Sequence, residues 1–326
     1  MNIAINGFGR IGRAVFRVAI ERKINIVAIN EVHGPEAAAY ALKFDSVYGR
    51  YNKEVKVKGN DIIVGDKRVK VIAERNPAKL PWKALNIDTV IESTGMFTRA
   101  KDAAQHIKSG AKKVIITAPA DNADATIVPC VNDGVLKSSH SIISVGSCTT
   151  NCAAAVAKVL LDNFGIKYAM LTTVHAYTND QLLLDNAHHN IRRGRAAGLN
   201  IIPTTTGAAE AVIEAIPELK GKMTGLSVRV PVACGSLIDL TCEVEKRVSI
   251  KDVNSALNKA SQTSMKGIIE YSKDALVSSD VIGNTHSAVV DALSTQTDGN
   301  LVKVLAWYDN ELGYSHRVVD IIQRLK

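Results

Sequence analysis

The sequence predicts an α/β protein with a doubly wound parallel sheet in its N-terminal part, followed by an α+β unit with a mainly antiparallel sheet. Three observations lead to this prediction. Short apolar runs alternate with stretches of helical periodicity over about the first 165 residues, which is typical of a parallel sheet with helical crossovers. Later strand-like segments are longer and alternate apolar with polar residues. The length of 326 residues corresponds to roughly two domains.

The first strand–helix–strand unit occupies the N-terminal 30 residues. Residues 2–6 form a mainly apolar run before a glycine cluster, residues 10–22 carry apolar side chains on one helical face, and residues 24–29 are again mainly apolar. Further strands are expected at 89–92, 114–117 and 141–145, and helices at 100–109 and 153–161. Residues 53–72 have the pattern of short antiparallel hairpins at the edge of this sheet.

The second unit is expected from strand-like segments at 168–177, 225–232 and 236–245, with a mixed pattern at 251–261 and 301–308. No linker rich in proline or glycine separates the two parts, so the boundary is expected to run through a helix near residue 150. The sequence therefore predicts a first domain over 1–148 and a second over 149–314. A C-terminal amphipathic helix over 315–326 is expected to pack back on the first domain.

Composition restricts the class of protein. Forty Lys and Arg against 32 Asp and Glu give a formal charge of +8, which suits either nucleic acid or small anions. No stretch approaches the ~18 uninterrupted apolar residues of a membrane span, and the N-terminus lacks the pattern of a signal peptide. Five scattered cysteines do not make a disulfide scaffold, so a cytoplasmic location is expected.

The glycine cluster Gly7-Phe8-Gly9-Arg10-Ile11-Gly12 follows the first strand and opens the first helix. In a dinucleotide-binding turn, Gly7 permits the tight turn, Gly9 lets a pyrophosphate approach the backbone, and Gly12 allows close helix–strand packing. The helix N-terminus offers N–H groups and partial positive charge to phosphate. Glu31, after the next strand, is expected to bind the adenosine ribose and repel a 2′-phosphate, which predicts NAD. The alternative is a plain glycine turn with a surface acid.

Cys148 lies in Ser147-Cys148-Thr149-Thr150-Asn151-Cys152, between a buried strand and a helix. The helix macrodipole is expected to lower the pKa of this thiol, so Cys148 is a candidate nucleophile. His175 is a candidate base that would stabilise the thiolate, with a structural histidine as the alternative. Cys152 is expected to be a small buried residue. The spacing of Cys148 and Cys152 lacks a second ligand pair, so no metal site is predicted.

Basic and hydroxyl side chains gather in three further segments: Arg192–Arg195, Pro203–Gly207 and the surroundings of Arg229. Arginine forks and threonine hydroxyls suit phosphate groups. The Arg192–Arg195 cluster alone is equally compatible with a solvated basic face or a nucleic-acid patch.

Five motifs occur in the order found in phosphorylating glyceraldehyde-3-phosphate dehydrogenases, and the chain resembles this family over essentially its whole length. The motifs are Asn6–Gly12, Ser147–Cys152, His175–Asp180, Pro203–Gly207 and Trp307–Glu311. The resemblance implies a homotetramer with a Rossmann NAD-binding domain and a catalytic domain. It also implies that Cys148 attacks the aldehyde while His175 acts as base. A hydride then passes to the nicotinamide, and inorganic phosphate cleaves the resulting thioester to an acyl phosphate.

The resemblance also assigns roles to individual side chains. Thr178 and Arg229 match positions that hold the phosphate of glyceraldehyde 3-phosphate, and Asp180 matches one that orients this arginine. The attacking inorganic phosphate is expected at Ser147, Thr149, Arg193, Thr206 and Gly207. Asn310 matches the residue that fixes the nicotinamide carboxamide. The other cofactor-binding positions are matched by Gly7, Gly9, Arg10, Ile11, Gly12, Glu31, Arg75, Thr94, Gly95, Thr117 and Tyr314.

Several positions depart from the family pattern. Val145-Gly146 stands where Asn-Ala is usual, and Leu312 replaces a frequent tryptophan. Glu31 stands where most NAD-dependent members have aspartate, and Asn186-Ala187 replaces a Leu-Pro pair associated with NAD preference. Glutamate here is also typical of the related erythrose-4-phosphate dehydrogenases. Those relatives lack the Pro203–Gly207 run, so glyceraldehyde 3-phosphate is the expected substrate.

Two other function classes stand as alternatives. A semialdehyde dehydrogenase would share the architecture, but the complete pair of phosphate sites argues against it. An RNA-binding or surface-binding secondary role rests on the +8 charge and the Arg192–Arg195 cluster. The sequence shows no aromatic-rich recognition strand, so nucleic acid is not expected as the primary partner.

Overall fold

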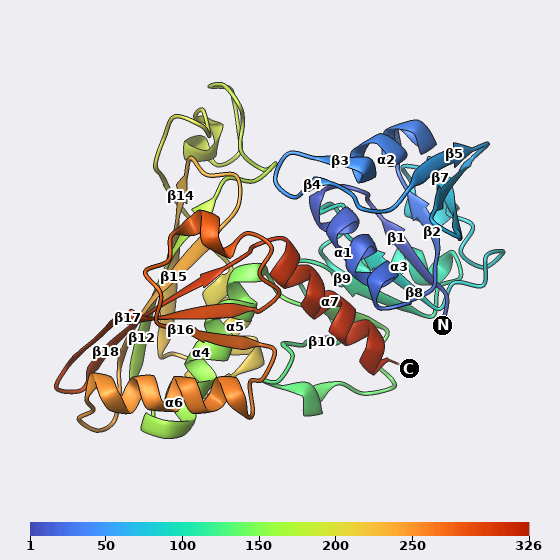
Figure 1. Cartoon of the computed structure of the whole chain (residues 1–326). Helices are drawn as coiled ribbons and strands as arrows, with labels where there is room; N and C mark the ends of the chain where they lie inside the picture. Colours follow the sequence, from blue (N-terminus) through green and yellow to red (C-terminus); the bar gives the residue numbers. More distant parts are fainter. Residues whose placement is uncertain (326) are drawn as a thin grey trace. The chain divides into compact units, whose positions relative to one another are not determined.

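The computed structural model describes residues 1–325 and divides into two compact units (Figure 1). The first contains Met1–Ile127, Gly134–Gly146 and the chain from Ser315 onward; the second contains Val128–Asp133 and Ser147–Tyr314. The chain thus leaves the first unit just before a helix, where the sequence predicts a boundary at residue 148. Lys326, the last residue of the predicted C-terminal helix, lies outside the described residues.

A nine-stranded sheet forms the centre of the first unit, in the order β10-β11-β9-β8-β1-β2-β7-β6-β5. Neighbours from β10 to β7 are parallel, and β6 and β5 continue the sheet antiparallel. This confirms the predicted doubly wound sheet. The expected antiparallel hairpins are formed by β5, β6 and β7, and β7 also pairs parallel with β2. The strands are β1 (Ile3–Asn6), β2 (Ile26–Asn30), β5 (Val55–Lys58), β6 (Asp61–Val64), β7 (Lys67–Ile72), β8 (Thr89–Glu92), β9 (Lys113–Ile116), β10 (Ala125–Thr126) and β11 (Ile142–Ser144).

Three longer helices belong to this unit. Helix α1 (Arg10–Glu21) buries Val15, Val18 and Ala19 on the face that the sequence predicts, and α3 (Ala100–Lys108) follows β8 as expected. The sequence analysis missed α2 (Gly34–Lys43), because its buried residues are Ala38, Ala39 and Leu42 and alanine gives little hydrophobic periodicity. Smaller elements are β3 (Phe44–Asp45), β4 (Gly49–Arg50) and the 3₁₀ turns at Pro77–Lys79 and Asp133–Val135.

Helix α7 (Leu312–Arg324) begins in the second unit and continues into the first. It therefore starts three residues before the predicted 315–326. Val318, Val319, Ile321 and Ile322 are fully buried, as an amphipathic helix requires. Arg22, at the end of α1, pairs with Asp320 and lies 2.7 Å from His316 Nδ1 through its Nη2.

The second unit is built on a seven-stranded sheet in the order β13-β14-β12-β15-β18-β17-β16. Its pairings are mainly antiparallel, as predicted; β12 with β14 and β16 with β17 are parallel. The strands are β12 (Tyr168–Ala176), β13 (Ile202–Thr204), β14 (Met223–Val230), β15 (Ser236–Glu243), β16 (Ile269–Ser272), β17 (Ala288–Asp298) and β18 (Leu301–Tyr308). 3₁₀ turns occur at Ile191–Gly194, Pro217–Leu219 and Ser278–Val281.

Helix α4 (Cys148–Phe164) lies against β15, β17 and β18 and forms the core of this unit. Its alanine-rich face allows close approach, and it contacts α5 (Ala208–Ala215) and α6 (Ile250–Gln262) (Figure 1). The segment at 251–261, which the sequence leaves as a mixed pattern, is part of α6. Among residues 1–325 no helix combines the length and apolarity needed to cross a membrane.

Candidate active site

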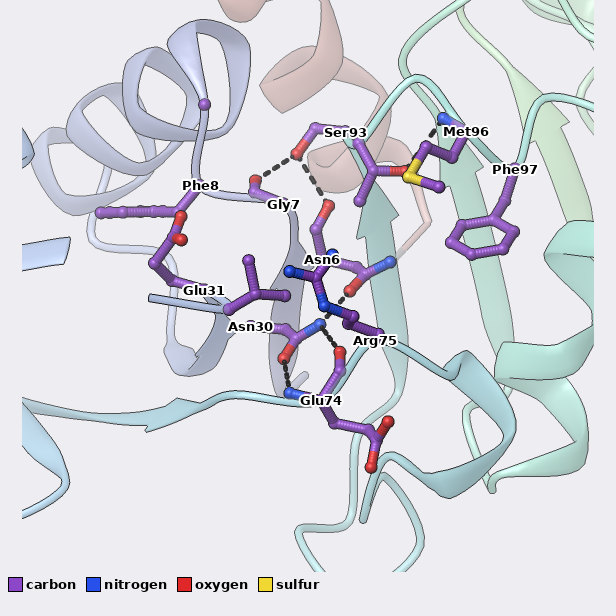
Figure 2. Close-up of a pocket in the computed structure, with 13 residues that line it drawn as sticks. Asn6, Gly7, Phe8, Asn30, Glu31, Glu74, Arg75, Ser93, Met96 and Phe97 are labelled. Carbon is purple, nitrogen blue, oxygen red and sulfur yellow. Dashed lines mark hydrogen bonds between the residues drawn. The ribbon is translucent and has the colours of Figure 1, made fainter. Parts of the chain in front are cut away.

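A cavity of about 320 Å³ opens in the first unit, at the carboxyl ends of β1, β2 and β8 (Figure 2). The strand order reverses between β2 and β8 on either side of β1, and ligands of doubly wound sheets bind at such a point. Of the predicted cofactor residues, Gly7, Gly9, Glu31, Arg75 and Thr94 line the cavity. The other lining residues are Asn6, Phe8, Asn30, Val32, Glu74, Ser93, Met96 and Phe97.

The three glycines of the first turn differ in whether the surrounding protein requires glycine at their position. Gly7 has φ +89°, and a Cβ there would lie 2.8 Å from Thr94. A Cβ on Gly12 would lie 2.1 Å from the Gly7 carbonyl oxygen. A Cβ on Gly9, in contrast, would meet no atom within 4 Å, so the protein itself does not require glycine there. Open space at Gly9 is what a pyrophosphate approaching the backbone needs.

The N-terminus of α1 is suited to an anion. Its N-cap is Gly9, which provides no side-chain cap, and its first turn contains no acidic residue. The exposed N–H groups and the positive end of the helix dipole therefore face no protein anion in the first turn. Arg10 directs its guanidinium to Asp45 at 2.6 Å, and Ile11 is half-buried in the helix.

Glu31 lies in the cavity wall, Gly95 and Thr117 follow β8 and β9, and the last two predicted cofactor residues belong to the second unit. Glu31 Oε1 accepts a hydrogen bond from the backbone N–H of His33 at 3.0 Å, which holds the carboxylate at the cavity wall. Gly95 adopts φ +74° in the turn after β8, and Thr117 Oγ1 donates to the Glu92 carbonyl at 3.1 Å. Asn310 and Tyr314 belong to the second unit, and both are buried.

The second unit brings the two predicted catalytic side chains into contact. Cys148 is the first residue of α4, and His175 lies near the end of β12; Sγ and Nε2 are 3.3 Å apart. The helix begins at Cys148, five residues before the predicted start, because Ser147 caps it. The Ser147 hydroxyl accepts from the Thr150 N–H at 3.0 Å, and Thr150 Oγ1 accepts from the Ser147 N–H at 3.1 Å.

Hydrogen bonding defines which nitrogen of His175 carries the proton. Nδ1 lies 2.7 Å from the carbonyl oxygen of Ala176, which can only accept, so Nδ1 is the protonated nitrogen. Nε2 is then an acceptor directed at Cys148 Sγ. The geometry is that of a base positioned to take the thiol proton.

Burial favours the neutral forms of both groups. Desolvation raises the pKa of Cys148 to about 11, although the charge of Arg229 and hydrogen bonds involving Thr149 act in the opposite direction. Desolvation also lowers the pKa of His175 to about 3, and Arg229 adds to this effect. Backbone N–H groups at the start of α4 lower the pKa of this thiol, as expected, but desolvation outweighs them, so the net direction is opposite to the predicted one. Cys148 still keeps part of its surface exposed, as an attacking thiol must.

Arg229 lies beside the catalytic pair because β14 is the parallel neighbour of β12, in register with His175 opposite Arg229. Its Nη1 donates to Thr178 Oγ1 at 3.1 Å and to the Ala176 carbonyl at 3.2 Å. Its buried Nε has no hydrogen-bond partner within residues 1–325. Arg229 is half-buried, and a guanidinium with a spare donor next to a threonine hydroxyl suits an anionic group.

Asp180 has a different partner from the one expected. Its carboxylate accepts from Arg193 Nη1 at 2.5 Å and acts on Arg229 only through its charge. Arg193 also donates to Thr204 Oγ1 and to the Thr205 carbonyl, each at 2.9 Å. Asp180, His188 and His189 place potential metal ligands within 4.8 Å of one another, but Arg193 already neutralises the carboxylate of this cluster.

Of the other residues predicted to bind inorganic phosphate, three lie at the start of a helix, and one has its side chain hydrogen-bonded inside the protein. Thr206 and Gly207 precede α5, where Thr206 Oγ1 accepts from the Ala208 N–H at 3.1 Å and Gly207 is exposed. Ser147 Oγ caps α4. The hydroxyl of Thr149, however, is buried and lies 2.8 Å from Tyr308 Oη, so it is engaged within the protein rather than presented to a ligand.

Two residues that the sequence analysis missed support the catalytic pair. Tyr308 Oη also lies 2.8 Å from Thr173 Oγ1, and its ring makes an edge contact with His175. Ser236 accepts from the Ala176 N–H at 3.1 Å and donates to Asn310 Oδ1 at 2.9 Å. Tyr308 is part of the motif that contains Asn310, which is a signal in the sequence; nothing there distinguishes Ser236.

Two glycine substitutions should separate ligand space from packing. In Gly9→Ala, the Kd for NAD should rise at least about tenfold, or 1.4 kcal/mol, because the methyl group occupies open cavity space. Its free energy of unfolding should change by less than about 1 kcal/mol. Gly12→Ala should instead lose about 1–3 kcal/mol of stability through overpacking. Calorimetric titration and urea unfolding measure both quantities. Unchanged NAD affinity in Gly9→Ala would contradict this assignment.

Removing the arginine charge beside the thiol should make Cys148 harder to ionise. In Arg229→Leu, the midpoint of the pH dependence of Cys148 alkylation by iodoacetamide should move upward by about 1 unit, because Arg229 lowers the pKa of this thiol. Arg195→Leu is the control, since Arg195 is exposed and pairs with Asp185. An unchanged or lower midpoint in Arg229→Leu would contradict the stabilisation of the Cys148 thiolate by Arg229.

Comparisons with known proteins agree with the motifs. Residues 1–100 match the family model of the glyceraldehyde 3-phosphate dehydrogenase NAD-binding domain, and residues 147–310 match that of the C-terminal domain. Glyceraldehyde-3-phosphate dehydrogenase from Geobacillus stearothermophilus is 53% identical over 324 residues, covering 98% of this chain and 97% of the relative. The Borreliella burgdorferi enzyme of that name is 52% identical over 335 residues, covering 100% and 99%. On this similarity, and with a cavity whose residues fit NAD, the chain belongs to the glyceraldehyde 3-phosphate dehydrogenase family.

Proposed function

We propose that the protein is a phosphorylating glyceraldehyde-3-phosphate dehydrogenase. It converts glyceraldehyde 3-phosphate, inorganic phosphate and NAD to 1,3-bisphosphoglycerate and NADH through a thioester on Cys148, a step of glycolysis and gluconeogenesis. The observation that supports this proposal best is the 3.3 Å contact between Cys148 Sγ and the unprotonated Nε2 of His175. Among the described residues, this contact joins a partly exposed thiol to a base whose other nitrogen is fixed by a backbone carbonyl.

The first step is addition of Cys148 to the aldehyde. Sulfur forms a bond to the carbonyl carbon while His175 Nε2 takes the thiol proton, so neither group needs to be charged beforehand. The imidazolium returns this proton to the developing alkoxide, which gives a hemithioacetal. NAD, when bound, supplies the hydride acceptor for the next step. His175 takes the hydroxyl proton of the hemithioacetal as its hydride departs, which leaves the thioester.

The two anion-binding regions suit the two phosphates of the reaction. Arg229 and Thr178 lie next to His175 and would hold the phosphate of the substrate. Ser147, Arg193, Thr206 and Gly207 would hold inorganic phosphate, which attacks the thioester carbon and expels the Cys148 thiolate. Because Arg193 is paired with Asp180, phosphate binding would replace the carboxylate of Asp180 by a phosphate as the anionic partner of Arg193.

The charge of Glu31 supports a preference for NAD over NADP. Glu31 lies in the cavity wall with its carboxylate held by the His33 N–H, and a 2′-phosphate there would meet a like charge. NAD is therefore expected to be preferred over NADP.

The protein is further proposed to form a homotetramer. The segment between β12 and β13 exposes a series of large apolar side chains: Leu183, Leu184, Ile191, Leu199 and Ile201, of which Leu183 is 84% and Ile191 86% exposed. Apolar groups exposed to this extent on one segment indicate an interface. A cytoplasmic location is proposed because the mechanism requires Cys148 to stay reduced, and all five cysteines are free.

Steady-state assays test the proposed reaction. NAD reduction by glyceraldehyde 3-phosphate should require inorganic phosphate and be faster than with erythrose 4-phosphate. Cys148→Ser should abolish turnover, and His175→Asn should lower kcat by about 10²–10⁴-fold through loss of the base. Cys242→Ser is the control for cysteine replacement, since Cys242 is buried in the core. Wild-type turnover in Cys148→Ser would eliminate the thioester mechanism.

Two further measurements test cofactor choice and assembly. The kcat/KM for NAD should exceed that for NADP, and Glu31→Gln should reduce this difference by removing the like charge. Light scattering should give the mass of four chains. The double variant Leu183→Asp/Ile191→Asp should give a smaller species. A monomeric wild-type protein would contradict the tetramer, and a higher kcat/KM for NADP would contradict the cofactor assignment.

A further inference from the structure

We propose that Glu92 is a positioning residue for NAD. Its buried carboxylate holds two residues of the cavity wall, Asn6 and Thr94, in place through hydrogen bonds. Glu92 is the last residue of β8 and is 2% exposed. It does not line the cavity, and the family motifs identified in the sequence do not include it. The inference rests on NAD binding in this cavity, which is part of the proposed function.

Four donors converge on the Glu92 carboxylate. Oε2 accepts from Asn6 Nδ2 at 2.6 Å and from His106 Nε2 at 2.9 Å. Oε1 accepts from the backbone N–H of Thr94 at 2.8 Å and from Thr94 Oγ1 at 2.5 Å. Every neighbour donates, so the carboxylate acts only as an acceptor.

The protonation state of His106 follows from its other partner. The indole N–H of Trp82 can only donate, and it lies 2.9 Å from His106 Nδ1. Nδ1 is therefore unprotonated, and Nε2 carries the hydrogen that points to Glu92. Asn6 Nδ2 and His106 Nε2, 3.4 Å apart, are both donors to the same oxygen and not to each other. His106 is thus a neutral imidazole that relays the indole hydrogen bond to a buried anion.

From Glu92 the network reaches the cavity by two routes. Asn6 and Thr94 both line it. Through Asn6, the network continues to Asn30, whose Nδ2 donates to Asn6 Oδ1 at 2.7 Å and whose side chain makes two bonds to the backbone of Glu74 (Figure 2). The ends of β1 and β2 and the segment after β7 are thereby held together.

Through Thr94, the network fixes the turn that follows β8. Thr94 Oγ1 accepts from the Met96 N–H at 3.1 Å, and the neighbouring Ser93 Oγ contacts the carbonyls of Gly7 and Asn6 at 2.7 and 3.0 Å (Figure 2). This turn packs on Gly7, where a Cβ would lie 2.8 Å from Thr94. A shift of Thr94 therefore moves the glycine turn that receives the pyrophosphate.

Glutamine cannot replace this carboxylate, although its size is the same. With its amide nitrogen in the place of Oε1, it would oppose the two donors of Thr94. With the nitrogen in the place of Oε2, it would oppose Asn6 and His106. His106 cannot accept by changing tautomer, because Nδ1 would then direct a hydrogen at the indole N–H of Trp82. Each orientation leaves buried donors unpaired, and the wall must move to relieve them.

The test compares Glu92→Gln with wild type and with Asp61→Asn. Asp61 is a buried carboxylate of the same unit, which pairs with Arg68 and does not line the cavity. In Glu92→Gln, the Kd and KM for NAD should rise at least about tenfold, while kcat at saturating NAD stays within about threefold of wild type. The KM for glyceraldehyde 3-phosphate should not change. Asp61→Asn should lose stability in urea without losing NAD affinity.

Thr94→Val is the second variant, in case Glu92→Gln does not fold. It removes one of the four donors with little change of shape, and should weaken NAD binding by a smaller factor. If Glu92→Gln folds, wild-type NAD affinity with only lower stability would overturn the positioning role. If only Thr94→Val folds, wild-type NAD affinity in that variant would overturn it. Failure of the wild-type protein to bind NAD would overturn the proposed function as well, so the two failures are distinguishable.

Discussion

The close contact of Cys148 with His175 depends on where helix α4 begins. Ser147 ends the extended backbone and caps the helix, so Cys148 becomes its first residue and points its sulfur toward the end of β12. The alanine-rich body of α4 fixes this position, because its buried residues belong to the core and α4 contacts β15, β17 and β18. The register of β12 with β14 then places Arg229 opposite His175. One cap and one strand register thus bring together the proposed nucleophile, base and anion-binding residue.

Desolvation governs the chemistry of this assembly. Burial keeps thiol and imidazole neutral, and Arg229 affects both, since it lowers the pKa of Cys148 and of His175. In the proposed mechanism, this neutral pair would transfer its proton as the sulfur attacks, which avoids a buried ion pair in the resting protein. Burial has a similar consequence in the first unit, where four donors, one of them a neutral histidine, satisfy the buried Glu92 carboxylate. The buried Glu92 carboxylate is thus matched to its donors within the protein, whereas the buried Nε of Arg229 is left without a partner among residues 1–325.

The sequence predicts more of the fold than of the contacts. The roles of Gly7 and Gly12 follow from spacing, because a turn between strand and helix has few solutions. Contacts between distant segments do not follow in this way: Cys148 and His175 are far apart in the chain, and only the packing of α4 on the sheet joins them. Asp180 shows the limit most clearly, since spacing cannot decide between two nearby arginines and the structure selects Arg193. The Glu92 network does not follow from the sequence, because buried hydrogen-bond partners leave no periodic pattern, whereas Tyr308 lies in the same motif as Asn310.

Trapping the covalent intermediate tests the thioester on Cys148 directly. Wild-type protein mixed with NAD and glyceraldehyde 3-phosphate, in the absence of inorganic phosphate, should form about one NADH per active site and then stop. Mass spectrometry should find the 3-phosphoglyceroyl group on the peptide that contains Cys148, and added phosphate should release it with renewed turnover. NADH formation that leaves Cys148 unmodified, or a label on another cysteine, would contradict the account.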